Sequence, residues 1–364
     1  MENRLARYSI HVLRSGSGGV SIAEPVSYAG VDNGDIRSWG IRNIAFIDSA
    51  TLKGVLRVKV VSVINYKGGV GKTTLTANLG AYVAMRGYRV LLIDLDPQTH
   101  LTFSFITLKE WREKYKDTRT LMHYFNALID GKPRISISSL AIPTRAPRCK
   151  QLDIVSSNLS MTDMDILLTG SCSSSVKSLL AGSSLRMYNY LSSGLEEVSG
   201  KYDLVLIDCP PNCNAMVRNA LIASRNCLIP ARMDYLSSLG IDNLRSSMFR
   251  FLTEYNGYVR DRSDMGYSEV GIRMLGVVPM MVGFQGGHMI NAHKMYMKKL
   301  KEDGYHVFPY LRESQKNFSV DRVKEGPLVL TPEAAKKGTK ESPLSRILQD
   351  LYAIGDEFLL SLNE

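Results

Sequence analysis

Three apolar, β-branched runs, each followed at once by a polar or glycine-rich turn, constrain the fold of this chain more than any other feature. They cover residues 56–66, 88–96 and 202–211, and the first leads through glycines into a helical pattern over 73–87. Continuous apolar runs of this length are typical of strands buried on both faces of a parallel sheet. Because strand, loop, helix and strand form a βαβ unit, the sequence predicts an α/β fold with a doubly wound, mostly parallel sheet flanked by helices.

The rest of the chain continues this alternation of strands and helices. Apolar runs predict further strands at 151–159, 226–233, 272–282 and 306–311, and helical patterns cover 101–131, 237–255, 291–304 and 344–362. The serine-rich stretch 170–184 is interpreted as a loop followed by the start of a helix. Residues 1–56 combine glycine-rich turn signals with weak periodicity, so we expect an N-terminal extension that is partly mobile.

A glycine-rich loop, KGGVGKTT at residues 67–74, joins the first strand to the first helix. Glycines let backbone N–H groups approach phosphate oxygens closely, and the start of a helix adds positive potential. In this setting Lys72 is expected to reach the β- and γ-phosphates, and the Thr73 hydroxyl to ligate Mg²⁺. With ATP and Mg²⁺ as ligands, the predicted nucleotide-binding residues are Lys67, Gly68, Gly69, Val70, Gly71, Lys72, Thr73 and Thr74.

A second lysine, Lys67, precedes the glycines, and Tyr66 stands where the common phosphate-binding loop has its first glycine. Together these residues resemble the deviant Walker A motif of the ParA/MinD superfamily of P-loop ATPases, which is marked by this extra lysine. The resemblance implies a homodimer in which two subunits sandwich two ATP molecules, and each Lys67 contacts the phosphates held by its partner. Such a cation supplied in trans would stabilise charge on the transferring phosphoryl group, as an arginine finger does.

Two aspartate motifs in the right order support the resemblance. Residues 91–98, LLIDLDPQ, are similar to the D-x-D-P-Q of the family, which implies that Asp96 orients or deprotonates the attacking water. Asp94 is interpreted as structural, or as a residue that orders water around Mg²⁺. Residues 204–211 resemble the Walker B strand, which implies that Asp208 holds Mg²⁺ through a water. The expected catalytic residues are Lys67, Lys72 and Asp96.

The basic character of the chain favours a polyanionic partner. Its formal net charge is +10, and its resemblance to ParA-type partition ATPases extends over about residues 57–362. The segment around Arg312 is similar to the family stretch that carries a surface arginine for non-specific DNA binding. The DNA-binding candidates are Arg312, Lys316, Lys298 and Lys299, with Lys301 extending the set. Contacts from these residues to phosphates would give salt-dependent, sequence-indifferent affinity, whereas the alternative is a solvated basic face.

The expected layout is an extension at 1–56 and a ParA-like ATPase domain at 57–364, with a basic helical insertion around 105–200. Between 107 and 150 the sequence has ten Lys/Arg against four Asp/Glu. Larger plasmid ParA proteins begin with a helix-turn-helix that reads operator DNA. Residues 1–57 show no such pattern, so the sequence gives no support for autorepression by specific DNA binding.

The resemblance implies a cytoplasmic, nucleoid-associated ATPase that positions plasmid, chromosome or other cargo through a ParB-like adaptor, with slow ATP hydrolysis as the release switch. The alternative is a regulatory or protein-positioning ATPase of the same superfamily that acts on a protein partner without DNA. We expect no membrane partner, because no run of eighteen apolar residues occurs and every charge after Arg346 is acidic. Five scattered cysteines match neither a zinc site nor the cluster site of a nitrogenase-reductase-like iron protein.

Overall fold

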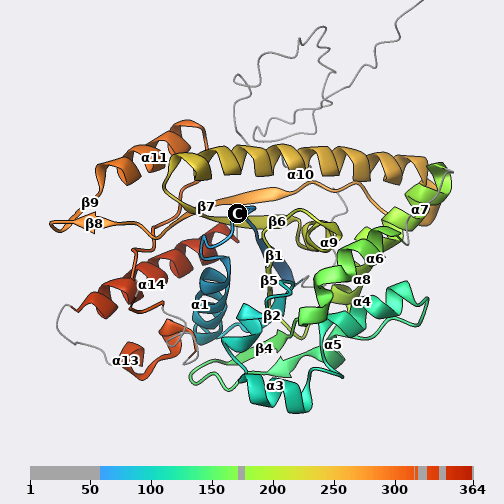
Figure 1. The fold of residues 1–364 in the computed structure, drawn as a ribbon, viewed down its shortest axis with the longest axis horizontal. Helices are drawn as coiled ribbons and strands as arrows, with labels where there is room; N and C mark the ends of the chain where they lie inside the picture. Colours follow the sequence, from blue (N-terminus) through green and yellow to red (C-terminus); the bar gives the residue numbers. More distant parts are fainter. Residues whose placement is uncertain (1–57, 171–176, 315, 319–325, 336–341, 363–364) are drawn as a thin grey trace, which may run out of the picture. The chain divides into compact units, whose positions relative to one another are not determined.

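In the computed structural model, the described residues are 58–170, 177–314, 316–318, 326–335 and 342–362. They form a seven-stranded sheet in the order β3-β4-β2-β5-β1-β6-β7 and a separate two-stranded sheet, β8-β9 (Figure 1). The strands are β1 (Lys59–Val63), β2 (Arg89–Asp94), β3 (Ile142–Pro143), β4 (Gln151–Val155), β5 (Leu204–Asp208), β6 (Asn226–Arg232), β7 (Arg273–Met280), β8 (Phe284–Gln285) and β9 (His288–Met289). The expected extension at 1–56 lies outside the described residues.

The predicted doubly wound, mostly parallel sheet is confirmed. Every neighbouring pair in the large sheet is parallel except β3 and β4, which run antiparallel. From β1 the chain continues to β2, in the direction of the β3 edge of the sheet. From β5 it continues to β6, in the opposite direction, towards the β7 edge. Parallel sheets bind ligands at such a reversal, in the crevice beyond the carboxyl ends of the strands.

Helices cover both faces of the sheet. They are α1 (Lys72–Met85), α2 (His100–Phe103), α3 (Leu108–Lys114), α4 (Leu121–Ile129), α5 (Ile137–Leu140), α6 (Met164–Gly170), α7 (Lys177–Tyr188), α8 (Tyr190–Glu196), α9 (Ala215–Ser224), α10 (Tyr235–Asp261), α11 (Asn291–Glu302), α13 (Pro332–Ala335) and α14 (Pro343–Ser361). Because side chains alternate along each strand, Leu92 and Leu206 pack with α1 and α14, whereas Leu91 and Ile207 pack with α8, α9 and α10. The strands are therefore buried on both sides, as their apolar runs predict.

The segment predicted as helical over 101–131 is divided into α2, α3 and α4. Thr107 begins α3 by accepting a hydrogen bond from the Glu110 backbone N–H. Turns follow α3, and Thr120, just before α4, forms an isolated parallel bridge to Ser156. Several basic side chains of the region 107–150 pair with nearby carboxylates, for example Arg134 with Glu197 at 2.7 Å. Of the ion pairs described for this region, only Arg134–Glu197 uses a carboxylate from outside it, so most of the basic excess counted over 107–150 remains.

The prediction of a regular strand at 306–311 is wrong. The segment follows the edge of β7, where Val307 makes an isolated parallel bridge to Val277 and the Phe308 N–H donates to the Val277 carbonyl at 2.9 Å. The next donor of this ladder would be residue 279 of β7, but that residue is Pro279 and has no N–H, so the ladder is interrupted and the Leu311 N–H donates to the Pro279 carbonyl at 2.8 Å. The strand pattern of the sequence therefore marks an edge segment of the sheet.

Two further regions complete the comparison with the predicted elements: the hairpin β8-β9 with helix α11, and the serine-rich stretch 170–184. The hairpin β8-β9 and helix α11 lie together beyond the end of β7 (Figure 1). The expected helix start within 170–184 corresponds to α7 at Lys177, whereas residues 171–176 are outside the described part of the chain.

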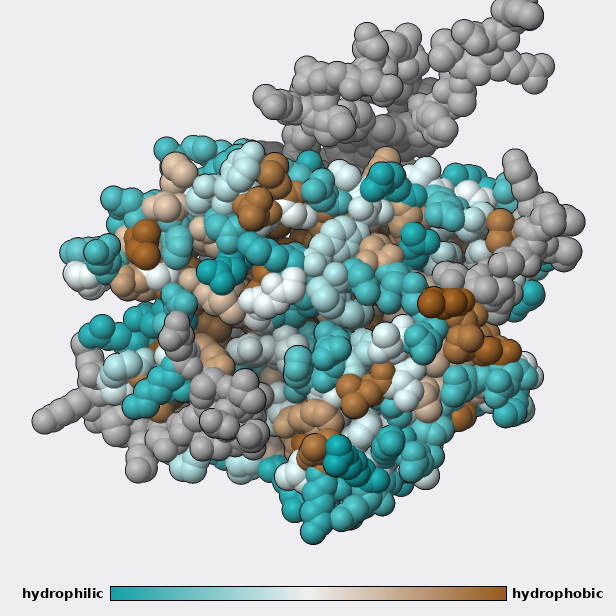
Figure 2. Space-filling model, in the orientation of Figure 1, coloured by the Kyte–Doolittle hydropathy of each residue, from teal (hydrophilic) through white to brown (hydrophobic). Residues whose placement is uncertain are grey.

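Among the described helices, none has the length and apolar character needed to cross a bilayer. The face drawn in Figure 2 is mainly hydrophilic, with small separate apolar groups.

Candidate nucleotide site

The three sequence motifs meet at the carboxyl ends of β1, β2 and β5. In the sheet register, Val63 at the end of β1 and Asp94 at the end of β2 both pair with Asp208 at the end of β5. The glycine-rich loop follows β1 and leads directly into α1. The sheet topology thus places the loop and both aspartate motifs around one crevice, at the reversal of strand order.

The loop depends on glycine at two positions. Gly69 has φ 68° and Gly71 has φ 90°, which lie in the left-handed region that other residues enter only with strain. Gly71 also precedes α1, and a Cβ built on it would lie 2.7 Å from Cε of Met280. The glycines therefore let the chain turn sharply into the helix, with the loop N–H groups around the helix start.

Asn65 anchors the loop to the neighbouring strand, a role that the sequence alone did not indicate. Its buried side chain donates through Nδ2 to the Pro230 carbonyl at 2.8 Å and accepts from the Lys67 backbone N–H at 3.0 Å. One amide therefore ties the end of β1, the first loop residue and β6 together. Such a link fixes the loop before any ligand arrives.

Lys72 is buried at the base of the loop. Its Nζ donates to the backbone carbonyls of Asn65 at 3.1 Å and Lys67 at 3.4 Å. Burial lowers the pKa of Lys72, and the nearby carboxylates of Asp208 and Asp96 act in the opposite direction. The ammonium therefore uses the loop's own carbonyls as acceptors, and phosphate oxygens could replace them.

Thr73 and Asp208 make the contact expected of a magnesium site. The Thr73 hydroxyl donates to Asp208 Oδ2 at 2.7 Å, and Asp208 is almost fully buried. Burial raises the pKa of Asp208 to about 7, although its hydrogen bond with Thr73 opposes the shift. Hydroxyl and carboxylate oxygens are ligands that Mg²⁺ accepts while keeping several waters and substrate phosphates. This donor set fits Mg²⁺, and within the described residues no cluster of three or more His, Cys, Asp or Glu competes with it.

The two aspartates after β2 have different surroundings. Asp94 is fully buried, and its Oδ2 accepts from both the backbone N–H and the hydroxyl of Thr102, at 2.8 and 2.7 Å. Burial, followed by the charge of Asp208, raises the pKa of Asp94 well above its ordinary value. Asp96 is only half-buried and accepts from the Gln98 backbone N–H at 2.9 Å. Asp94 therefore braces the loop after β2, and Asp96 is the aspartate with access to a ligand.

Lys67 forms an ion pair with Asp234, a residue that the sequence analysis did not identify. Its Nζ lies 3.0 Å from Asp234 Oδ2 and 3.1 Å from Asp234 Oδ1, and it donates to the Ser237 hydroxyl at 3.2 Å. Asp234 caps the N-terminus of α10 by accepting from the Ser237 N–H at 2.7 Å. The sequence does contain a signal for this helix start: Asp234 is a residue type that commonly caps helices, it follows an apolar strand, and Ser237 stands three positions later.

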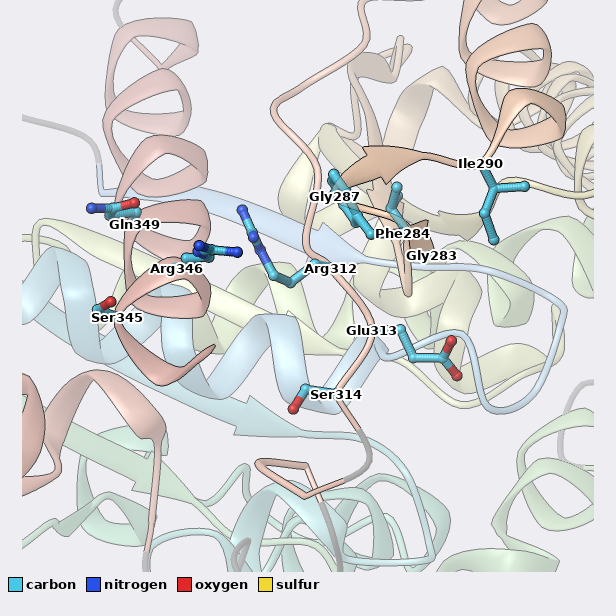
Figure 3. A pocket seen from close by; sticks show the side chains of 11 residues that line it. Gly283, Phe284, Gly287, Ile290, Arg312, Glu313, Ser314, Ser345, Arg346 and Gln349 are labelled. Carbon is cyan, nitrogen blue, oxygen red and sulfur yellow. The ribbon is translucent and has the colours of Figure 1, made fainter. Parts of the chain in front are cut away.

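A cavity of about 1010 Å³ opens beyond the end of β7, near the loop (Figure 3). Its walls come from the turn after β7, the segment 312–314 and the first turns of α14. Met281 immediately precedes this turn, and its Cε lies 4.0 Å from a Cβ built on Gly71. Met281 thus connects the turn that lines the cavity to the start of α1. Its lining residues are Val282, Gly283, Phe284, Gly287, Ile290, Arg312, Glu313, Ser314, Ser345, Arg346 and Gln349.

The candidate DNA-binding residues fall into two groups. Arg312 lines the cavity, and its guanidinium binds the buried Asp350 through Nε at 2.6 Å and Nη2 at 2.9 Å, while lying over the Phe284 ring. Its charge is thus already matched within the chain. In contrast, the side chain of Lys298 is 78% exposed, with a 3.5 Å contact to Glu302. All four candidate lysines are exposed: Lys298, Lys299, Lys301 and Lys316.

Sequence comparisons agree with the motifs. A profile of the AAA_31 family, described as an AAA domain, matches residues 58–260, more than half of the chain. The sporulation initiation inhibitor protein Soj of Bacillus subtilis is 31% identical over 190 residues, which cover 52% of this chain and 64% of Soj. A Sinorhizobium fredii protein named for a role in replication is 33% identical over 214 residues, which cover 58% of this chain and 46% of that protein. The chain thus matches about half to two thirds of these relatives' lengths.

Solved structures share the fold at low sequence identity. The complex of a McdA variant with ATP, from Cyanothece, has a TM-score of 0.58 and 17% identity, with 83% of this chain and 96% of that chain covered. A plasmid partition protein from Borrelia burgdorferi has a TM-score of 0.51 and 19% identity, with 74% and 94% covered. With the profile match, the fold and the order of the three motifs, the chain belongs to the AAA_31 family, within the ParA/MinD superfamily of P-loop NTPases.

Proposed function

We propose that this protein is an ATP-dependent, dimerising ATPase of the partition type, which binds DNA non-specifically and positions cargo through a ParB-like adaptor. The observation that carries the proposal is the 2.7 Å contact between Thr73 and Asp208 beside the glycine-rich loop. It unites the hydroxyl and the carboxylate that a Mg²⁺-nucleotide site requires. Slow hydrolysis would then release the cargo, which is a plasmid, a chromosome or another large body.

The loop residues supply phosphate binding. The backbone N–H groups of residues 68–74 and the N-terminus of α1 would surround the phosphates, and Lys72 would exchange its carbonyl acceptors for phosphate oxygens. When bound, Mg²⁺ neutralises charge between the phosphates, held by Thr73 and, through water, by Asp208. Asp96 would orient or deprotonate the attacking water, because its buried neighbour Asp94 is already occupied by Thr102.

The cavity beyond β7 suits the nucleoside part of ATP. The turn that lines it follows Met281, which reaches the start of α1, and the cavity combines an aromatic ring, Phe284, with the polar side chains Ser314 and Gln349. Ligand sites commonly combine apolar walls with a few such polar groups. In this arrangement Arg312 would shape the cavity wall through its pair with Asp350, in addition to any contact with DNA.

Lys67 would act on the nucleotide of a second subunit. Its position at the start of the loop, on a partly exposed side chain, suits contact with a facing copy that holds its own ATP. The transferring phosphoryl group would then receive a cation from each subunit, Lys72 in cis and Lys67 in trans. A site completed in this way makes hydrolysis dependent on dimerisation.

The proposed DNA surface centres on α11 and extends to Lys316. Lys298, Lys299 and Lys301 lie on α11 with exposed side chains, which suits contact with phosphates without reading bases. The Borrelia plasmid partition protein supports the partition role by its name, and the McdA complex with ATP supports ATP as the nucleotide. A cytoplasmic, nucleoid-associated location follows from this role.

The second candidate function is a regulatory or protein-positioning ATPase that acts on a protein partner without DNA. The pairing of Arg312 with Asp350 favours it, because that arginine is less available to a polyanion than the sequence suggests. Binding of random duplex DNA separates the two functions. The partition proposal predicts ATP-dependent binding that weakens steeply between low and physiological salt and is lost in Lys72→Ala. If the ATP-bound protein ignores duplex DNA at low salt, the second function stands.

A further inference from the structure

Helix α3 and the turns that follow it expose a row of basic side chains. Lys109, Arg112 and Lys116 follow one another at intervals of three and four residues, the spacing that places side chains on one face of a helix. After α3 the Arg119 N–H donates to the Tyr115 carbonyl at 2.8 Å, which continues a helical course to Arg119. The α3 row is defined here as the four exposed side chains Lys109, Arg112, Lys116 and Arg119.

The charges of the α3 row are not paired within the described part of the chain. The ion pairs between described residues of this region leave out all four members of the row. Glu110 lies 3.3 Å from Lys114 and 3.4 Å from Arg145, so one carboxylate already serves two further cations. The side chain of Arg145 is 85% exposed, and this contact places it beside α3. Six cations therefore share the surface with three carboxylates, those of Glu110, Glu113 and Asp117.

The body of the protein holds α3 from the side opposite the row. Trp111 is 2% exposed, and its ring meets that of Phe103 edge-on, with the ring centroids 5.6 Å apart. Phe103 belongs to α2, where the neighbouring Thr102 donates to the buried Asp94 at the end of β2. The row is thus presented to solvent on a support that is packed into the core.

Exposed cations on such a support fit the phosphates of duplex DNA. The duplex carries about one negative charge per 1.7 Å of its axis, so several phosphates lie within reach of one short row. A membrane surface fits less well, because an interfacial helix turns its apolar face outwards, whereas Trp111 of α3 is buried. Within α3, Leu108 is the one large apolar side chain that is exposed, at 44%.

The α3 row and the lysines of α11 lie towards opposite edges of the sheet. Helix α3 belongs to the connection from β2 to β3, and the contact of Glu110 with Arg145 holds it beside the loop that follows β3. Helix α11 follows β7, and β3 and β7 are the two edge strands (Figure 1). Contacts made by one surface therefore do not require contacts made by the other.

We propose that the α3 row, together with Arg145, is a second surface that binds duplex DNA through its phosphates, independently of the lysines on α11. This inference rests on the proposed function, since it requires a chain that binds DNA. It assigns a DNA contact to a segment outside the three nucleotide motifs and outside the region around Arg312. Contacts of this kind add affinity without reading the base sequence.

The salt dependence of DNA binding tests the proposal. The full chain, with a non-hydrolysable ATP analogue and Mg²⁺, is titrated into a fluorescent duplex of random sequence at several salt concentrations, and anisotropy gives the association constant. The α3 triple combines Lys109→Gln, Arg112→Gln and Lys116→Gln. Each lost phosphate contact removes about 0.9 from the slope of log K against log salt, so the slope of this triple should be shallower by about 2 to 3.

A matched triple removes the same charge from other parts of the chain. It combines Arg245→Gln, Lys132→Gln and Arg260→Gln, three basic side chains that each contact a carboxylate of their own subunit. Its salt slope should equal that of wild type, which separates a local contact from an effect of net charge. Thermal unfolding confirms that each variant is folded before it is compared.

An α11 triple, Lys298→Gln with Lys299→Gln and Lys301→Gln, separates the two surfaces. Because the surfaces share no contact, the loss of slope in the α3 triple and in the α11 triple should add when all six substitutions are combined. A shallower slope in the α3 triple, with the matched triple unchanged, supports the second surface.

The contrary outcomes distinguish the inference from the function beneath it. If wild type binds DNA and the α11 triple weakens it, but the α3 triple behaves like the matched triple, the second surface is wrong and the proposed function stands. If wild type ignores the duplex at low salt, the DNA role itself is wrong, and the α3 row has no part in it. If the α3 triple loses binding to phosphatidylglycerol vesicles but not to DNA, the row serves a membrane and the inference is overturned.

Discussion

The Thr73 hydroxyl donates a 2.7 Å hydrogen bond to Asp208 Oδ2, which joins the first turn of α1 to the end of β5. The two residues are 135 positions apart in the sequence, and the parallel register of β1 and β5 brings them together. A hydroxyl and a buried carboxylate at this distance form a site prepared for a small, oxygen-seeking cation. The chemistry proposed for the crevice depends on this arrangement.

Asp208→Asn should weaken the contribution of Mg²⁺ to nucleotide binding. The amide keeps the volume of the carboxylate and can still accept from Thr73, but it lacks the charge that attracts the cation. We expect affinity for ATP in the presence of Mg²⁺ to fall by at least about tenfold, or about 1.4 kcal/mol. Calorimetric titration with and without EDTA measures the change. An unaltered response to Mg²⁺ would remove Asp208 from the metal site.

The two lysines of the loop should have separable roles. Lys72→Ala should abolish nucleotide binding, because it removes the buried ammonium at the base of the loop. Lys67→Ala should bind ATP but lose hydrolysis by about a thousandfold, as expected when a trans cation is removed. Fluorescent-nucleotide binding and phosphate release measure the two effects. Wild-type turnover in Lys67→Ala would contradict the trans role.

Thr102→Val should destabilise the fold. The Thr102 hydroxyl donates to the fully buried carboxyl of Asp94, which would be left with one fewer donor. We expect the free energy of unfolding to fall by about 1–3 kcal/mol, measured by urea denaturation. Thr118→Val is the matched control, because the Thr118 hydroxyl donates to the Lys114 carbonyl in an exposed setting. Equal stability of the two variants would show that Asp94 does not depend on Thr102.

The free energy of unfolding should depend on pH through the carboxylate of Asp203. Hydrogen bonds from the Arg89 side chain, with contacts as short as 2.7 Å, hold the pKa of Asp203 below its ordinary value. Because the folded pKa is the lower one, the pair stabilises the protein above about pH 4 and loses this effect as pH falls through the folded value. The urea midpoints of wild type and Asp203→Asn should therefore differ at about pH 6, by up to about 1 kcal/mol in stability, and converge towards about pH 3. A difference in stability between wild type and Asp203→Asn that does not change with pH would contradict the stabilising role assigned to the Arg89–Asp203 pair.

The sequence was sufficient to predict the sheet and the position of the glycine-rich loop between its first strand and first helix, for a physical reason. β-Branched runs ending in Asp94 and Asp208 specify buried parallel strands, and parallel strands bring their carboxyl ends to one edge. Contacts between distant side chains leave no periodic signal, so the pairs Lys67–Asp234 and Arg312–Asp350 could not be predicted. The edge segment at 306–311 has the composition of a strand, and only the neighbouring backbone decides whether a ladder forms.

Mixing two inactive variants tests the central claim most directly. Asp96→Ala should form ATP-bound dimers that do not turn over, and Lys67→Ala should also be inactive. In a mixed dimer, the nucleotide of the Lys67→Ala subunit has its own Asp96 and receives Lys67 from the other subunit, so one complete site is restored. At equal concentrations the mixture should recover about a quarter of wild-type phosphate release, since half of the dimers are mixed and each has one complete site. If the mixture stays as inactive as its components, the site is not shared between subunits and the account is wrong.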